Sequence, residues 1–161
     1  MFGPHLMLDL YGCEKKKLVD VKFVLNFLGE LPKILGMKKV SGPHLLEYPA
    51  NPETWDKGGI SAIVIIAESH ISIHTFPHPN GYMNIDIFSC KEFDFALAEK
   101  KISEAFGAEK FEKNLLWRGR EFPKEEILAQ NCARNQRKHL KLARPKAFNI
   151  SPQIPIHANN R

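Results

Sequence analysis

The sequence is short of cysteine, of long apolar runs and, toward its C-terminal end, of acidic residues. Its three cysteines, Cys13, Cys90 and Cys132, are an odd number and none lies in a CxxC spacing. A disulfide framework is therefore not expected, and the thiols are predicted to be reduced and available for chemistry.

Membrane and export signals are also missing from the sequence. The longest largely apolar stretch, residues 60–67, is far shorter than the roughly 20 residues that a membrane-spanning helix needs. The first residues, MFGPH, lack the basic flank and apolar segment of a signal peptide. A cytoplasmic protein without a membrane partner is therefore predicted.

The formal net charge of +5 comes from one end of the chain. Residues 131–161 contain seven lysines and arginines and no aspartate or glutamate, so residues 1–130 are slightly acidic. The basic segment also holds Pro145, Pro152 and Pro155, which favours a weakly ordered tail that is solvated or lies on another subunit. It lacks interleaved aromatic residues, so nucleic acid is not an expected partner. We predict one domain over residues 1–130, followed by this tail.

Hydrophobic periodicity within the domain alternates between strand and helix. Residues 5–11, 39–48, 60–67, 70–76, 83–90 and 110–118 are predicted strands, of which 60–67 and 70–76 could also form one interrupted strand. Residues 18–35 and 93–106 have helical spacing, and Gly36 is a plausible C-terminal stop for the first helix. The pattern predicts an α+β fold, with helices packed on an antiparallel sheet.

The predicted strand 70–76 has an apolar face and a polar one. Period two places Ile71 and Ile73 on one side and His70, Ser72, His74 and Phe76 on the other. This polar and aromatic face is either an ordinary half-exposed surface or part of a substrate pocket. A metal site using histidines every four residues, up to His78, is disfavoured because neighbours four apart on a strand are roughly 13 Å apart. No metal is predicted.

Two longer segments carry a resemblance to a known family. Residues 61–77 read SAIVIIAESHISIHTFP and residues 85–90 read IDIFSC. Together with GPHL at residues 3–6, DLYGC at 9–13 and RGR at 118–120, they resemble the prokaryotic S-adenosylmethionine decarboxylases, which are pyruvoyl-dependent enzymes of polyamine and spermidine synthesis. The resemblance covers about residues 3–120 and implies a two-layer α/β sandwich.

The resemblance implies that the chain cleaves itself between Glu68 and Ser69. The Ser69 hydroxyl would attack the Glu68 carbonyl and convert the amide into an ester. Elimination and hydrolysis would then leave a pyruvoyl group at the start of the second fragment. By the same analogy Ser61 and His74 assist processing, with His74 as the base in ester breakdown. An ordinary planar amide is unreactive, so the carbonyl must be strained or its oxyanion stabilised.

The implied reaction is decarboxylation through the self-generated pyruvoyl cofactor. A substrate amine would form a Schiff base with the pyruvoyl carbonyl, which accepts the electron pair released with carbon dioxide. A cysteine donates the returning proton in this family, and Cys90 occupies the matching position. Without the resemblance, Cys90 would be read as a small buried apolar residue. Cys13 receives a structural role only.

Substrate recognition departs from the family pattern. Family members commonly have Trp-Pro-Glu after His-Thr, where this chain has Phe76-Pro77-His78. The glutamate can accept hydrogen bonds from ribose hydroxyls, an interaction that imidazole does not reproduce in the same way. Phe76 could stack on adenine or lie near a sulfonium, and Tyr48 or Trp55 could supply a second aromatic ring. Core packing is the alternative for each.

Three functions are consistent with these residues. The first is an S-adenosylmethionine decarboxylase, with a small amino-acid-type substrate. The second is a pyruvoyl-dependent decarboxylase of arginine or ornithine, favoured by the loss of the glutamate. The third is a noncatalytic activating subunit, which would not require Ser69, His74 and Cys90 together. The resemblance also implies a homodimer of processed fragments, with each site completed near the subunit interface.

Overall fold

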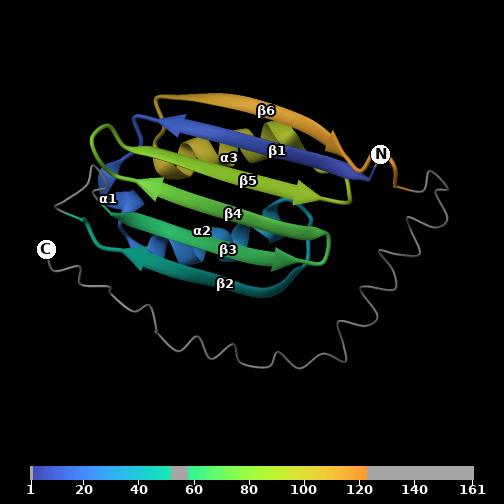
Figure 1. The fold of residues 1–161 in the computed structure, drawn as a ribbon, viewed down its shortest axis with the longest axis horizontal. Helices are drawn as coiled ribbons and strands as arrows, with labels where there is room; N and C mark the ends of the chain where they lie inside the picture. The colour runs from blue at the N-terminus through green and yellow to red at the C-terminus, as the bar shows by residue number, and fades with distance from the viewer. Residues whose placement is uncertain (1, 52–57, 123–161) are drawn as a thin grey trace, which may run out of the picture.

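The computed structural model describes residues 2–51 and 58–122. In this part of the chain six strands form one antiparallel sheet in the order β2-β3-β4-β5-β1-β6 (Figure 1). The strands are β1 (Gly3–Tyr11), β2 (Lys39–Tyr48), β3 (Gly59–Ile66), β4 (Ser69–Phe76), β5 (Tyr82–Ser89) and β6 (Lys110–Arg118). The helices are α1 (Lys15–Leu18), α2 (Val21–Ile34) and α3 (Phe95–Phe106).

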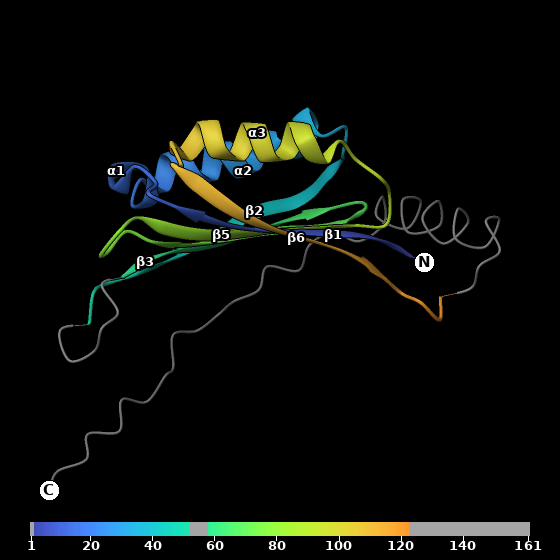
Figure 2. The ribbon, with the colours of Figure 1, turned by 90° about the horizontal axis from the view of Figure 1, so that it is seen from above.

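The helices lie together on one side of the sheet (Figure 2). Alternating strand residues point toward them, and this face is apolar because most inward-facing residues of the central strands are leucine, isoleucine, valine or methionine. The buried side chains include Leu6, Leu8, Leu10, Ile71, Ile73, Met83, Ile85 and Ile87 from the sheet and Val24, Leu28, Leu31, Ala98, Ile102 and Phe106 from the helices. The predicted two-layer α+β sandwich with helices on one face is confirmed.

The helix boundaries differ from the sequence prediction at their N-terminal ends. The predicted helix 18–35 begins three residues later, as α2, because the Asp20 carboxylate accepts the Phe23 N–H at 2.9 Å and caps its first turn. Leu18 instead ends the short helix α1. In the same way Asp94 accepts the Leu97 N–H at 2.9 Å, so the second helix begins two residues later than predicted. The predicted stop is confirmed, since Gly36 follows α2 with a φ of 67°.

The segment around the predicted cleavage site forms a hairpin. Strands β3 and β4 are separate and are joined by a turn of two residues, Ala67 and Glu68. The turn is fixed to the residue before β2, because the Ala67 N–H donates to the Lys38 carbonyl at 2.8 Å and the Lys38 N–H donates to Glu68 Oε2 at 3.2 Å. The bond between Glu68 and Ser69 is thus the last bond of a tight, anchored turn.

Several predictions concern residues outside the described part of the chain. They are the aromatic role of Trp55, the basic tail 131–161 and the unassigned Cys132. Among the described residues, no helix is long and apolar enough to span a membrane.

Candidate active site

The sheet side opposite the helices carries Ser61, His74 and Phe76 from among the predicted site residues. We call this side the open face, because no described helix covers it (Figure 2). Cross-strand register and alternation assign its residues on the inner strands. They are His5, Met7 and Asp9 on β1, Ser61, Ile63 and Ile65 on β3, His70, Ser72, His74 and Phe76 on β4, and Tyr82, Asn84, Asp86 and Phe88 on β5.

Ser69 begins β4 in a strained backbone conformation. Its φ of 153° is positive, and among the described residues no other non-glycine residue has a positive φ. Such conformations cost on the order of 1–3 kcal/mol and persist where the surrounding structure imposes them. The Ser69 hydroxyl lies 3.1 Å from Nδ1 of His70. The predicted nucleophile is therefore strained and contacts a potential base.

Cys90 lies beside the bond that is predicted to break. Its backbone N–H donates to the Glu68 carbonyl oxygen at 2.9 Å. The strand register explains this contact, since Ser69 pairs with Ser89 at the end of β5. Ser89 is fully buried, and its hydroxyl bonds the backbone of Lys91 at 2.7 and 3.0 Å, which fixes the chain on both sides of Cys90. The carbonyl that Ser69 would attack is therefore polarised by a backbone donor.

Ser61 and His74 form a second pair. They are direct cross-strand partners on β3 and β4, and the Ser61 hydroxyl lies 2.8 Å from Nδ1 of His74. The His74 side chain is exposed on the open face. The two residues that the resemblance assigns to processing are therefore in direct contact, and their role stays a prediction.

Ser69 and the Ser61–His74 pair lie at different ends of β4. His74 follows Ser69 by five residues, which corresponds to roughly 16 Å along a strand. The same separation holds on β3, where Ile66 pairs with Ser69 and Ser61 pairs with His74. Glu68, Ser69 and Cys90 therefore form one group, here called the cleavage group. Ser61 and His74 form another, the Ser61–His74 group.

The predicted substrate-binding residues lie at the Ser61–His74 end. Phe76 is the last residue of β4, with its ring centroid 5.6 Å from that of Tyr82. Tyr48 ends β2 with 49% of its surface exposed, and His78 is exposed in the turn that follows β4. Phe76 lies seven residues beyond Ser69, or roughly 23 Å along the strand. Within one chain these side chains do not surround the cleavage group.

Two further clusters on the open face were not singled out from the sequence. Beside Phe76, the Tyr82 hydroxyl donates to Asp9, and burial together with this hydrogen bond raises the pKa of Tyr82 to about 12. Near Ser69, the Phe88 ring lies between His5 and His70, at centroid distances of 5.6 and 6.0 Å. Cross-strand register could have revealed both clusters, but register is not readable from one sequence.

Burial shifts the pKa values of two residues near this site, His5 on β1 and Cys13 just after β1. Burial lowers the pKa of His5, and Arg118 and His70 act in the same direction, against the Asp86 carboxylate 3.6 Å away. Burial raises the pKa of Cys13 to about 11, so this thiol stays protonated near neutral pH. The structural role predicted for Cys13 is consistent with this environment. Among the described residues, no three histidine, cysteine or acidic side chains gather as metal ligands do.

Comparisons with known proteins point to one family. The family model described as S-adenosylmethionine decarboxylase matches residues 4–119. A protein of Anoxybacillus flavithermus named S-adenosylmethionine decarboxylase proenzyme is 36% identical over 118 residues, which are 73% of this chain and 87% of that protein. A Synechococcus protein of the same name is 35% identical over 100 residues, covering 62% of this chain and 70% of the relative. The crystal structure of the adenosylmethionine decarboxylase of Aquifex aeolicus matches with a TM-score of 0.60 and 28% identity, over 78% of this chain and 95% of that one.

Proposed function

Because the chain belongs to the S-adenosylmethionine decarboxylase family, we propose that it is a self-processing carboxy-lyase that acts on S-adenosylmethionine. One observation carries the proposal. The Glu68 carbonyl oxygen accepts the Cys90 N–H at 2.9 Å, directly before a strained serine. A polarised carbonyl next to a hydroxyl in a strained conformation is the arrangement that an amide-to-ester shift requires.

The cleavage group also fits a pyruvoyl group formed from Ser69. Residue 69 is held at the start of β4 by pairing with Ile66 and Ser89, so a new chain end there would remain within the sheet. A pyruvoyl group at that position would supply a carbonyl that accepts the substrate amine and the electron pair left by carbon dioxide. The Cys90 N–H donates to the carbonyl of the neighbouring Glu68, which supports the proposal that Cys90 returns the proton.

We predict that Cys90→Ala separates cleavage from product formation. Alanine keeps the backbone N–H that contacts the Glu68 carbonyl, so the chain should still be cleaved. Loss of the proton donor should lower the rate of correct product formation by about 10²- to 10⁴-fold. Intact mass and product analysis measure the two effects on one sample. Cys13→Ala is the matched thiol control and should keep turnover; normal turnover of Cys90→Ala would move the proton donor elsewhere.

We also propose that the enzyme works as a homodimer in which the partner supplies its Ser61–His74 group. A single chain leaves His74 roughly 16 Å along β4 from Ser69, too far to act on the same bond. The open face is suited to a second sheet, because Leu46, Ile63, Ile65 and Leu116 expose 58, 36, 37 and 57% of their surface. In a two-fold arrangement each Ser61–His74 group can approach the other chain's cleavage group.

A second function, decarboxylation of arginine or ornithine, is supported by one residue of the predicted substrate site. His78 replaces a glutamate that family members commonly use toward ribose, and its side chain is exposed beside the Phe76 end of β4. A decarboxylase of arginine or ornithine would not need a ribose contact. Phe76 and Tyr82, whose rings meet at a tilt of 30° at this end, still offer aromatic faces to adenine or to a sulfonium, so S-adenosylmethionine is the first substrate proposed.

A parallel assay of carbon dioxide release with S-adenosylmethionine, arginine and ornithine tests the function. We expect release from S-adenosylmethionine by protein whose intact mass shows fragments 1–68 and 69–161. Release from arginine or ornithine alone would establish the second function instead. Cleaved protein that releases carbon dioxide from none of the three would contradict the proposed function.

A further inference from the structure

We propose that His70 is the base that removes the Ser69 proton in the first step of self-cleavage. The inference rests on the proposed function, because it assigns a residue to the amide-to-ester shift at the same bond. His70 Nδ1 lies 3.1 Å from the Ser69 hydroxyl oxygen, within the range of a catalytic hydrogen bond. Its role is separate from that of His74, which is predicted to act on the ester.

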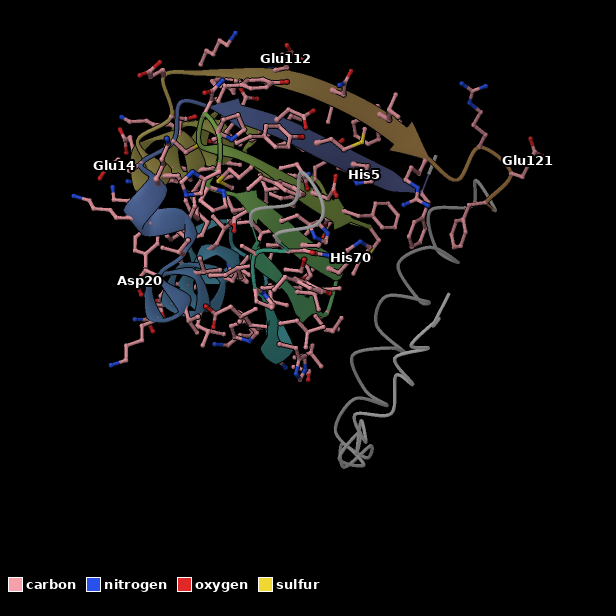
Figure 3. The ribbon with its side chains drawn as sticks, turned by 60° about the vertical axis from the view of Figure 1, so that its left-hand side comes forward. His5, Glu14, Asp20, His70, Glu112 and Glu121 are labelled. Carbon is pink, nitrogen blue, oxygen red and sulfur yellow. The ribbon has the colours of Figure 1, made fainter. Side chains whose placement is uncertain are left out.

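The surroundings of His70 hold its ring next to Ser69. His70 and Phe88 are direct cross-strand partners, and their rings meet edge to face at a centroid distance of 6.0 Å. Phe88 is supported on its other side by His5 and by the Arg118 guanidinium, which lies 4.4 Å from the ring centroid. Figure 3 shows His5 and His70 at the same end of the sheet. This packing limits the rotation of the imidazole.

The other described candidates for this base are directed elsewhere. His74 contacts Ser61 at the far end of β4. Nε2 of His5 lies 3.6 Å from Asp86, and the Phe88 ring separates His5 from His70. The Glu68 carboxylate accepts the Lys38 N–H, which turns it toward β2. His70 is therefore the base that the geometry favours for the Ser69 hydroxyl.

The step balances within the chain. When the Nε2–H tautomer is present, Nδ1 of His70 accepts the Ser69 proton. Ser69 Oγ bonds to the Glu68 carbonyl carbon, and the developing oxyanion is stabilised by the Cys90 N–H. The carbon–nitrogen bond between residues 68 and 69 breaks, and His70 returns the proton to the Ser69 nitrogen. The product is an ester with a free amine, and neither water nor an oxidant is consumed.

Hydroxylamine trapping distinguishes the two histidines. Freshly translated chains of wild type, His70→Gln and His74→Ala are followed by intact mass, with and without mild hydroxylamine, which cleaves an ester between residues 68 and 69. Any slower cut at Asn80-Gly81 gives fragments of a different mass. Glutamine can accept a hydrogen bond from Ser69 but cannot take its proton. We expect His70→Gln to slow cleavage by about 10²- to 10⁴-fold and to give no hydroxylamine-sensitive ester. His74→Ala is expected to form the ester and to stop there.

Rescue by imidazole tests the base directly. We expect added imidazole to restore cleavage of His70→Ala in proportion to its concentration, and to have no effect on Ser69→Ala. His44→Ala is the matched control, because His44 lies on the outer strand β2 and bonds Ser41 at 3.0 Å; it should cleave as wild type. Cleavage of His70→Gln at the wild-type rate, or ester accumulation in it, would overturn the inference alone. A wild-type chain that never cleaves would overturn the proposed function.

Discussion

Ser69→Ala is expected to remain a single chain of 161 residues, with no fragment 69–161 after prolonged incubation. Alanine has no hydroxyl to attack the Glu68 carbonyl, and nothing else in the cleavage group can form the ester. The Cys90 N–H still polarises the carbonyl, but an amide without its nucleophile stays intact. Intact mass of the purified protein measures the result, and carbon dioxide release should be lost with the cleavage.

The fold should survive this substitution. Ser69 makes its backbone contacts with Ile66 and Ser89 through the sheet ladder, which alanine retains. Ser72→Ala is the matched control, because it removes a hydroxyl from the same strand, where Ser72 lies 3.5 Å from Asp86; this variant should cleave. Normal cleavage of Ser69→Ala would show that the scissile bond is assigned to the wrong position.

Much of the fold was predictable because its elements depend on local alternation. Strands β1, β4 and β5 were predicted to within two residues of their observed bounds, since buried and more exposed residues alternate through them. Strands β2 and β6 were predicted with their observed bounds, although this alternation is weak in both. The break between α1 and α2 was not predicted. It depends on the Asp20 side chain reaching the Phe23 N–H, and an aspartate within a helical pattern does not reveal on its own whether it caps a helix.

The family and the carboxy-lyase class predicted from the segments 61–77 and 85–90 are confirmed by the family match over residues 4–119. The roles of Ser69, His74 and Cys90 stay predictions. Their spatial arrangement was less accessible from the sequence, because it depends on register between strands. The sequence assigned Ser61 and His74 to processing at Ser69 without giving their distance from it, and the paired strands place His74 five residues from Ser69 along the sheet.

Mixing two inactive chains is expected to restore cleavage across the subunit interface. His74→Ala retains Ser69 but lacks the processing base, and Ser69→Ala retains His74 but lacks the nucleophile. When the two are coexpressed with different tags, a mixed dimer pairs the intact Ser69 of one chain with the intact His74 of the other. Fragment 69–161 should then form from the His74→Ala chain alone, although neither variant forms it when expressed by itself.

The physical reason is the distance along β4. If His74 acted on its own chain, it would have to span roughly 16 Å to the bond between Glu68 and Ser69. Its hydrogen bond with Ser61 holds it on the open face, away from that scissile bond. Coexpression of Ser69→Ala with Ser61→Ala should restore cleavage of the Ser61→Ala chain to a similar degree, because Ser61 and His74 form one group. As a control, a double variant lacking both Ser69 and His74 should fail to rescue His74→Ala. If the mixed dimers form but stay uncleaved, His74 acts within its own chain, and β4 must rearrange before the ester breaks down.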